Sequence, residues 1–504
     1  MVKTLRARGG LVGKADSCDV VVVGAGNAAL AAAVAARQAG AKRVVVLEKA
    51  PLEQRGGNTH YSGGIYRFAY DELAKLLPLL PADAPAEERN LEGFQTYLPA
   101  DFRADLMRVT DGRTDPELSD LLISRSYDTV RWVAGLGVRI EFAAKTHNGV
   151  RRNLVKYSKG AVIRAEHHGV GLSKMWFDIA EGNGIEIRYE SAATGLMVNA
   201  QGAVCGAEYR GSNGPQTLRA ASVVLGAGGF ESNPAWRAQY LGRPWDHAKV
   251  RGTAFNQGDG LRMAMDIGAM PFGNWTGCHA TPIAADEPAY GDRKLTDRSN
   301  RVSYIYSVML NTRGERFLDE GFEQQLHTYA RYGGVILNQP GSLAFQIFDQ
   351  KVVHLLEPRY STSAPIVAQT LEDLVAQLPL NRGTAMRTLN EFNAAARDEH
   401  AFDPTRKDGL RTKGLPIDKT NWAQRLDTPP FVCYPATGGI TFTFGGLKID
   451  ANARVIGTDW RPITGLYACG EMVGGLFHGN YPGGSGLTSG AVFGRIAGTA
   501  AAGA

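Results

Sequence analysis

The chain has 504 residues, of which 44% are hydrophobic and 21% are charged, and this ordinary globular composition excludes a disordered or fibrous protein. The net charge is +5, but the lysines and arginines are dispersed, which excludes the basic patch of a nucleic-acid-binding protein. The five cysteines lie far apart, without the spacing of zinc, iron–sulfur or covalent haem sites, so we expect no metal and a reducing, cytoplasmic location.

The N-terminal segment, residues 1–17, is basic and lacks the apolar stretch of a signal peptide, so we expect a loose arm. The apolar run over residues 20–36 is interrupted by Gly24, Gly26 and Asn27 and is too short to span a bilayer. The sequence therefore predicts no membrane segment.

A strand, a helix and a second strand come next. Residues 20–23 are an unbroken valine run, GAGNAALAAAVAARQAGA has the small residues of a packed helix, and a second valine-rich run follows, which predicts a βαβ unit. Gly24 allows a tight turn, Gly26 lets backbone approach a pyrophosphate, and Ala29 permits close helix–strand packing. Glu48 ends the second strand, where an acid accepts hydrogen bonds from a ribose. This context predicts a bound dinucleotide.

A glycine-rich segment, RGGNTHYSGG at residues 55–64, lies soon after the second strand. It places the small polar side chains of Asn58, Thr59 and Ser62 among four glycines, where backbone can pass close to a ligand. These groups are suited to line the edge of a flavin near N5. The segment therefore favours a flavin over a nicotinamide.

The strand and helix pattern continues and then changes. An αβ pattern over residues 172–189, a hairpin over 196–209 and a strand over 221–225 lead to residues 266–427, which lose the βαβ regularity and are rich in Trp, Tyr, His and Arg. The glycine-rich β pattern returns after Pro430. We infer that the middle of the chain is an insertion.

The expected fold is α/β, with a Rossmann-like FAD-binding domain and an inserted α+β capping domain. The FAD-binding domain would comprise residues 1–265 and 429–504, and the capping domain residues 266–428.

The last glycine-rich segment, residues 465–498, supplies a strand, the acid Glu471, a glycine turn and a helix that begins near Gly486. We expect the helix N-terminus to face flavin N1 and O2. Two-electron reduction leaves negative charge there, and a helix dipole with free backbone N–H groups stabilises it.

These segments, with VVLGAGGFESN, FNQGDGLRMAMDIGA and NTRGERFLDE, resemble the fumarate reductase and succinate dehydrogenase flavoprotein superfamily over nearly the whole chain. The branches that look most similar are the tricarballylate dehydrogenase-like proteins and, through NYPGG, the 3-ketosteroid Δ1-dehydrogenases. The resemblance implies FAD and a mobile cap. Together with the glycine turns, it assigns the cofactor to Gly24, Ala25, Gly26, Asn27, Ala28, Glu48, Lys49, Gly57, Asn58, Thr59, Ser62, Gly63, Gly64, Ala193, Ala227, Gly228, Asp259, Thr443, Glu471, Ser485, Gly486 and Leu487.

The resemblance also bears on how FAD is attached. Relatives such as succinate dehydrogenase bind FAD covalently through a histidine that lies six residues before the double glycine. That position here is Gly57, and His60 falls elsewhere. We therefore expect noncovalent FAD.

Three positions depart from the fumarate reductases. Their proton-donating arginine falls at Gln324, a substrate-binding histidine at Phe442 and an arginine at Tyr481. A dicarboxylate would lose three partners, and each charge-assisted contact is worth roughly 1.5–3 kcal/mol. Only His279, in CHATP, matches the histidine that holds a substrate carboxylate in that family. The departures argue against fumarate reduction.

Tyr481 matches a tyrosine that, in the ketosteroid enzymes, helps to polarise the substrate ketone together with a backbone N–H that here belongs to Ser485. A polarised carbonyl has a more acidic α-proton, so a base can remove that proton while the β-hydride leaves to flavin N5. The base is open among His327, Tyr329 and Arg331. We favour Tyr329, with Arg331 lowering its pKa. The catalytic candidates are thus Tyr481, Tyr329, His279 and Arg331.

The sequence therefore predicts an FAD-dependent dehydrogenase that desaturates a carbon–carbon bond next to a carbonyl or carboxyl group of a small molecule. Its electrons would pass to an external acceptor or an electron-transfer protein. A tricarballylate-like acid is favoured by Arg298, Arg301, His279 and Arg331. A cyclic ketone is favoured by Trp275, Tyr304, Tyr306, Phe442 and Tyr481. Two alternatives stay open: an ene-reductase of the fumarate reductase type that runs the reverse reaction, and a noncatalytic flavoprotein subunit.

Overall fold

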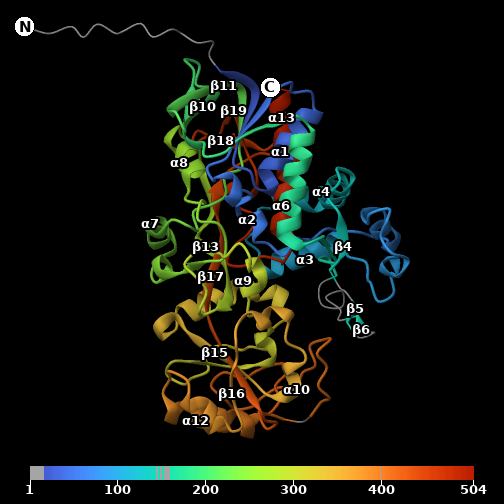
Figure 1. Cartoon of the computed structure of the whole chain (residues 1–504), viewed down its shortest axis with the longest axis vertical. Coiled ribbons are helices and arrows are strands. Elements are labelled where there is room, and N and C mark those ends of the chain that lie inside the picture. Colours follow the sequence, from blue (N-terminus) through green and yellow to red (C-terminus); the bar gives the residue numbers. More distant parts are fainter. Residues whose placement is uncertain (1–15, 144–145, 148–149, 152–158, 398, 504) are drawn as a thin grey trace, which may run out of the picture.

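The computed structural model describes residues 16–143, 146–147, 150–151, 159–397 and 399–503. Figure 1 shows two lobes stacked along the long axis, with both ends of the chain in one lobe and the yellow-to-orange middle of the chain in the other. Residues 1–15 of the expected N-terminal arm lie outside the described residues. Ser17, which we assigned to the arm, already begins the first strand.

An eight-stranded sheet forms the centre of the first lobe. Its parallel strands lie in the order β19-β11-β1-β2-β8, and their valine runs are buried, as both faces of a parallel sheet require. The parallel strands are β1 (Ser17–Val23), β2 (Val44–Leu47), β8 (Glu186–Arg188), β11 (Gly214–Leu225) and β19 (Pro462–Ala468). Antiparallel strands at the edges are β9 (Ala192–Val198), β10 (Val204–Gly211) and β18 (Arg454–Ile456). The predicted α/β class is confirmed.

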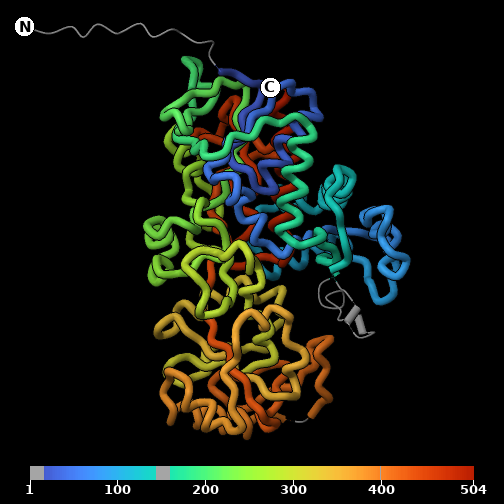
Figure 2. Tube along the Cα trace, in the orientation of Figure 1, coloured from blue at the N-terminus to red at the C-terminus, as the bar shows by residue number. Residues whose placement is uncertain are grey.

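Three helices pack together beside this sheet: α1 (Asn27–Gln38), α6 (His168–Gly182) and α13 (Ser485–Ala502). The backbones of α1 and α13 approach closely because their facing residues are small. A Cβ at Gly494 would stand 2.4 Å from the carbonyl oxygen of Ala28, and one at Gly498 would stand 2.0 Å from that of Ala32. Figure 2 shows the consequence, with the blue N-terminal and red C-terminal segments running together in one lobe.

A flank of the first lobe, coloured blue to cyan in Figure 1, was not predicted from the sequence. A three-stranded antiparallel sheet is joined there by helices that follow the RGGNTHYSGG segment. The three strands are β3 (Ile65–Tyr66), β4 (Ile140–Phe142) and β7 (Ile163–Ala165), and the helices are α3 (Pro99–Val109) and α4 (Pro116–Gly135). The strands β5 (Thr146–His147) and β6 (Val150–Arg151) form a separate two-stranded sheet. The short helix α2 (Gly57–His60) lies within the RGGNTHYSGG segment itself.

A six-stranded sheet runs from the second lobe into the junction with the first lobe. Its strands are β12 (Lys249–Val250), β13 (Pro271–Ala284), β14 (Val308–Asn311), β15 (Ala344–Phe348), β16 (Ile366–Ala368) and β17 (Phe431–Leu447). Residues 431–436 of β17 pair with β15 and β16, whereas residues 436–447 pair with β13. The boundary predicted at residue 429 thus precedes a strand that belongs to both lobes.

Short helices complete the chain. They are α7 (Pro234–Trp236), α8 (Asp259–Asp266), α9 (Tyr329–Leu337), α10 (Gln350–Val353), α11 (Leu371–Ala376) and α12 (Arg382–Ala395). In the second lobe, which we call the cap, α11 and α12 begin with side-chain caps from Thr370 and Asn381 and cover the sheet with Leu374, Leu389 and Phe392. Over the described ranges, no helix has the length and apolar character needed to cross a bilayer.

Candidate active site

The carboxyl ends of the parallel strands open into a cavity of about 1240 Å³ that continues under the cap. Parallel α/β sheets place their ligand sites at this edge. Every residue that we predicted to bind the cofactor lines the cavity except Ser485. Ser485 is buried, and its backbone N–H donates to the carbonyl oxygen of Pro482, 3.1 Å away.

The turn between β1 and α1 explains why GAGNAA has its glycines. Gly24 has a φ of 97°, and a Cβ there would stand 2.5 Å from the carbonyl oxygen of Gly226. Gly26 caps α1 without a side-chain hydrogen bond, and Gly484 begins α13 in the same way. Two helix N-termini without a side-chain cap at Gly26 or Gly484 therefore line one cavity, an arrangement suited to anionic groups.

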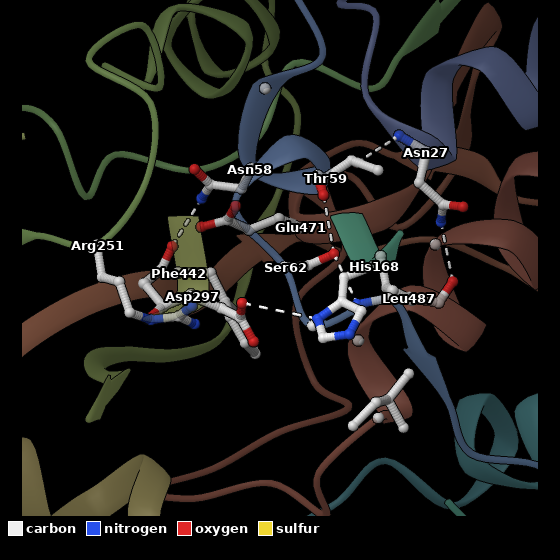
Figure 3. A pocket seen from close by; sticks show the side chains of 18 of the residues that line it. Asn27, Asn58, Thr59, Ser62, His168, Arg251, Asp297, Phe442, Glu471 and Leu487 are labelled. Atoms are coloured by element: carbon white, nitrogen blue, oxygen red, sulfur yellow. Dashed lines mark hydrogen bonds and ion pairs between the residues drawn. The ribbon is translucent and has the colours of Figure 1, made fainter. Parts of the chain in front are cut away.

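Asn27 joins the two ends of the chain in this cavity, as Figure 3 shows. Its backbone N–H donates to Thr59 Oγ1 at 2.8 Å, and its side-chain amide donates to the carbonyl oxygen of Leu487 at 2.9 Å. Tyr66 and Trp176 donate to the other side of the same amide. The three glycine-rich segments are thus fixed relative to one another.

Glu48 stands at the end of β2, as the sequence predicts, and is only 7% exposed. Its Oε1 accepts a hydrogen bond of 2.7 Å from the Ala50 N–H, and burial raises the pKa of its carboxyl group. Beside it, Lys49 forms an ion pair of 2.7 Å with Asp259. The carboxyl group of Glu48 lines the cavity and is placed to accept hydrogen bonds from a ribose.

A second buried acid that the sequence did not reveal, Glu231, lies next to Glu471. Glu231 accepts hydrogen bonds of 2.7 Å from the side chains of Asn58 and Asn256, and Glu471 accepts one of 2.7 Å from the Thr443 N–H. Burial and the neighbouring Glu471 raise the pKa of Glu231 well above its usual range. A raised pKa favours the neutral form of Glu231, and this lowers the repulsion between two neighbouring acids.

Tyr329 from α9 of the cap and Tyr481 from the NYPGG turn meet where the cavity passes between the lobes. Their phenol groups hydrogen-bond to each other, and both side chains line the cavity. Burial raises the pKa of both phenols, whereas the nearby charge of Arg251 lowers them. The Gly484 N–H also favours the Tyr481 phenolate. That amide, and not the one of Ser485, is the backbone donor beside this phenol.

His279 does not reach the cavity. Its cross-strand partner Phe442 stacks on it, with ring centres 5.2 Å apart and planes at 15°, and lines the cavity in its place. Both ring nitrogens of His279 are buried without a hydrogen-bond partner, and burial lowers its pKa well below the usual range. In this arrangement Phe442 stands between His279 and the cavity, so the structure gives no support to the expectation that His279 holds a substrate carboxylate.

Arg331 is exposed and lies outside the cavity lining. It follows Tyr329 by two positions on α9, and residues two apart on a helix do not face each other. Arg331 therefore does not lower the pKa of Tyr329, contrary to our expectation. His60 also lies outside the lining, with Nε2 3.3 Å from the carbonyl oxygen of Arg293.

Sequence analysis missed the charged groups on the cap side of the cavity. Asp297 is held by Arg359 at 2.8 Å and faces His168 at 3.9 Å (Figure 3). Burial opposes ionisation of Asp297, but the charges of Arg359 and Arg251 and the contact with His168 lower its pKa to about 2. The residues are far apart in the chain and belong to no motif, so no sequence signal could have grouped them.

Comparison with known proteins agrees with this geometry. A family model described as FAD binding domain matches residues 19–487. A probable fumarate reductase of Shewanella frigidimarina is 28% identical over 97% of this chain and 76% of its own length. A 3-oxosteroid 1-dehydrogenase of Mycobacterium tuberculosis is 27% identical over 95% of this chain and 97% of its own.

A solved structure is also similar. The open conformation of a flavocytochrome c3 fumarate reductase has a TM-score of 0.72 and 26% identity, covering 97% of this chain and 79% of that one. The predicted superfamily, its ketosteroid dehydrogenase-like neighbours and the FAD cofactor are confirmed. The two uncapped helix N-termini and the acid after β2 fit such a cofactor. The chain belongs to the FAD-binding-domain family and is an FAD-dependent oxidoreductase that acts on CH–CH groups.

Proposed function

We propose that the protein desaturates a carbon–carbon bond next to an activating carbonyl or carboxyl group, and that a cyclic ketone fits it better than an open-chain acid. The observation that carries this proposal is the Tyr329–Tyr481 phenol pair in the cavity between the lobes. Phe442, Phe444 and Phe477 line the same cavity and provide apolar walls for a ring. The similarity to a 3-oxosteroid 1-dehydrogenase supports the same substrate class.

The two phenols would divide the work. A carbonyl oxygen that enters the cavity replaces the contact between them and accepts a hydrogen bond from Tyr481, which makes the α-proton more acidic. Tyr329, as its phenolate, takes that proton on Oη. FAD, when bound in the first lobe, supplies the acceptor for the β-hydride. Burial opposes ionisation of Tyr329 and keeps its pKa raised, and positive charge from Arg251 and Arg359 reduces this effect only in part.

The reverse reaction is the second candidate, because a probable fumarate reductase is among the similar proteins. The same phenols would then protonate an alkene. Gln324, at the position of the family's proton-donating arginine, lies outside the cavity lining, and Phe442 and Tyr481 supply no cation. These residues favour desaturation, with electrons passing to an external acceptor.

The five free thiols support a reducing, cytoplasmic location.

Anaerobic mixing with substrate tests the direction of the reaction. A panel of saturated cyclic ketones and carboxylic acids should include compounds that bleach the visible absorption of the oxidised flavin without any other reductant. If no member of a broad panel bleaches the flavin, while reduced enzyme is reoxidised by α,β-unsaturated compounds, the protein is a reductase.

Tyr481→Phe separates an enzyme from a noncatalytic subunit. It should slow bleaching by roughly 10²–10⁴-fold, the usual worth of a proton-donating group, with FAD retained. Tyr332→Phe is the matched control, because this α9 phenol donates to the carbonyl oxygen of Asp319 and lies outside the cavity lining. Equal rates in the two variants would exclude a role for Tyr481.

A further inference from the structure

Arg251 is a buried cation that the proposed chemistry does not account for. It follows β12, is 8% exposed and lines the cavity. Its Nε donates to Thr441 Oγ1 at 3.1 Å, and its Nη1 donates to the carbonyl oxygen of Tyr61 at 3.2 Å. Both acceptors are neutral, and Nη2 has no acceptor among the residues that the structure describes.

The other cations of the lining have counter-ions or reach solvent. Arg298 is exposed and bonds to backbone carbonyl oxygens of its own turn. The remaining ion pairs are Lys49–Asp259 at 2.7 Å, Arg164–Glu141 at 2.7 Å, Arg359–Asp297 at 2.8 Å, Arg359–Glu357 at 3.4 Å and His168–Asp297 at 3.9 Å. Within the described ranges, Arg251 forms no ion pair. Asp297 is the acid whose charge acts most on Arg251, but that carboxylate already contacts Arg359 and His168.

A buried guanidinium without a counter-ion is costly, because it has lost water and gained no carboxylate. Arg237 and Arg301 are also buried among neutral acceptors, but they lie outside the cavity lining. Arg251 differs because it lines the cavity, where a ligand can supply the missing anion. Arg251 lies on the substrate side of the cavity, since its charge acts on both Tyr329 and Tyr481, and Figure 3 places it near Phe442 and Asp297. Guanidinium groups match the planar geometry of carboxylates.

We propose that Arg251 binds a carboxylate carried by the substrate, so that the substrate is a cyclic keto acid. Its carbonyl oxygen lies at Tyr481 and its carboxylate at the free Nη2 edge of Arg251. This inference rests on the proposed desaturation for the carbonyl end. The carboxylate end rests on Arg251 alone and can be tested without turnover.

The first experiment measures binding to the FAD-loaded enzyme through the change in flavin absorbance. The probes are cyclohexanecarboxylate and cyclohexanecarboxamide, then oxocyclohexanecarboxylates and their methyl esters. Arg251→Gln should weaken the binding of the carboxylates by roughly 10–100-fold, as expected for a lost charge-assisted contact. The affinity for the amide and the esters should stay unchanged. Arg251→Lys should recover part of the affinity. Arg237→Gln is the matched control that should change the binding of neither class of probe, because Arg237 is also a buried arginine but donates to the backbone oxygens of Ala248 and Asp246 and lies outside the cavity lining.

The outcomes separate this inference from the proposed function. If Arg251→Gln lowers the affinity for acids and esters equally, or if the wild-type enzyme binds the esters more tightly than the acids, Arg251 does not bind a carboxylate. Its charge then acts only on the two phenols. Bleaching by neutral ketones that depends on Tyr481 but not on Arg251 would leave desaturation standing and overturn the keto acid. If no ketone bleaches the flavin but carboxylate binding still requires Arg251, the carboxylate site stands and desaturation fails.

Discussion

At the scale of single residues, exposure to the cavity decides which predicted groups can act. Tyr329 and Tyr481 reach it, whereas His279 lies behind Phe442 and Arg331 faces solvent. Arg251 is the cation that acts on both phenols, while Arg359 acts on Tyr329 and Arg67 on Tyr481. Residue type and family position suggested the first set, but only packing distinguishes a side chain that lines a cavity from one that is buried behind another ring.

The pH dependence of desaturation follows from the raised pKa of Tyr329. When the pKa of a base lies well above the assay pH, the ionised fraction is small and grows tenfold per pH unit. We expect the bleaching rate with a saturated ketone to rise about tenfold per unit between roughly pH 7 and pH 9, and Tyr329→Phe should abolish the rise.

A plateau at lower pH would identify another base. The remaining candidate from the sequence, His327, lies outside the cavity lining and faces Asp105 at 3.7 Å, and burial lowers its pKa. A histidine base would therefore give a flat rate above about pH 6.5. That result would contradict the assignment of Tyr329.

At the scale of elements, the site depends on close backbone approaches more than on long side chains. The β1–α1 turn passes against Gly226, and α13 crosses α1 through small residues. Valine runs and small-residue helices were readable from the sequence because their periodicity is local. The boundary predicted at residue 429 puts the whole of β17 in the FAD-binding domain, although residues 431–436 pair with strands of the cap. A linear pattern does not record which strands pair with each other.

Gly24→Ala tests the turn. A methyl group would meet the carbonyl oxygen of Gly226 at 2.5 Å in a backbone with φ of 97°, so the turn must shift and the FAD site with it. Gly40→Ala is the matched control, because Gly40 has φ of 108° with nothing within 4 Å. We expect Gly24→Ala to lose FAD on gel filtration, and Gly40→Ala to keep FAD and lose about 1 kcal/mol of unfolding free energy. Retention of FAD by Gly24→Ala would show that the close approach is dispensable.

At the scale of the whole molecule, segments from both ends of the chain and from the cap enclose one cavity. FAD binding should therefore stabilise the first lobe as a unit, because Asn27 ties the glycine segments that hold it. The cap adds the phenol of Tyr329 and the Arg359–Asp297 ion pair.

Removal of FAD tests both the mode of attachment and this coupling. Because His60 lies outside the lining, denaturation should release all flavin into the filtrate, and readdition at a hundredfold excess over Kd should raise the unfolding free energy by about 2.7 kcal/mol. Thermal unfolding of apoprotein with and without FAD measures the gain. Flavin that stays with the precipitated chain would instead show a covalent bond.

The sequence by itself determined the FAD family and the βαβ unit, and it predicted the inserted cap and residues that line the cavity, because these depend on local periodicity and on glycines at fixed spacing. It also pointed to Tyr329 and Tyr481. Only the tertiary structure decided that His279 and Arg331 are outside the cavity, that Glu231 pairs with Glu471, and that Arg251 is a buried cation without a counter-ion. Burial and charge pairing arise between residues distant in the chain, so no local pattern records them.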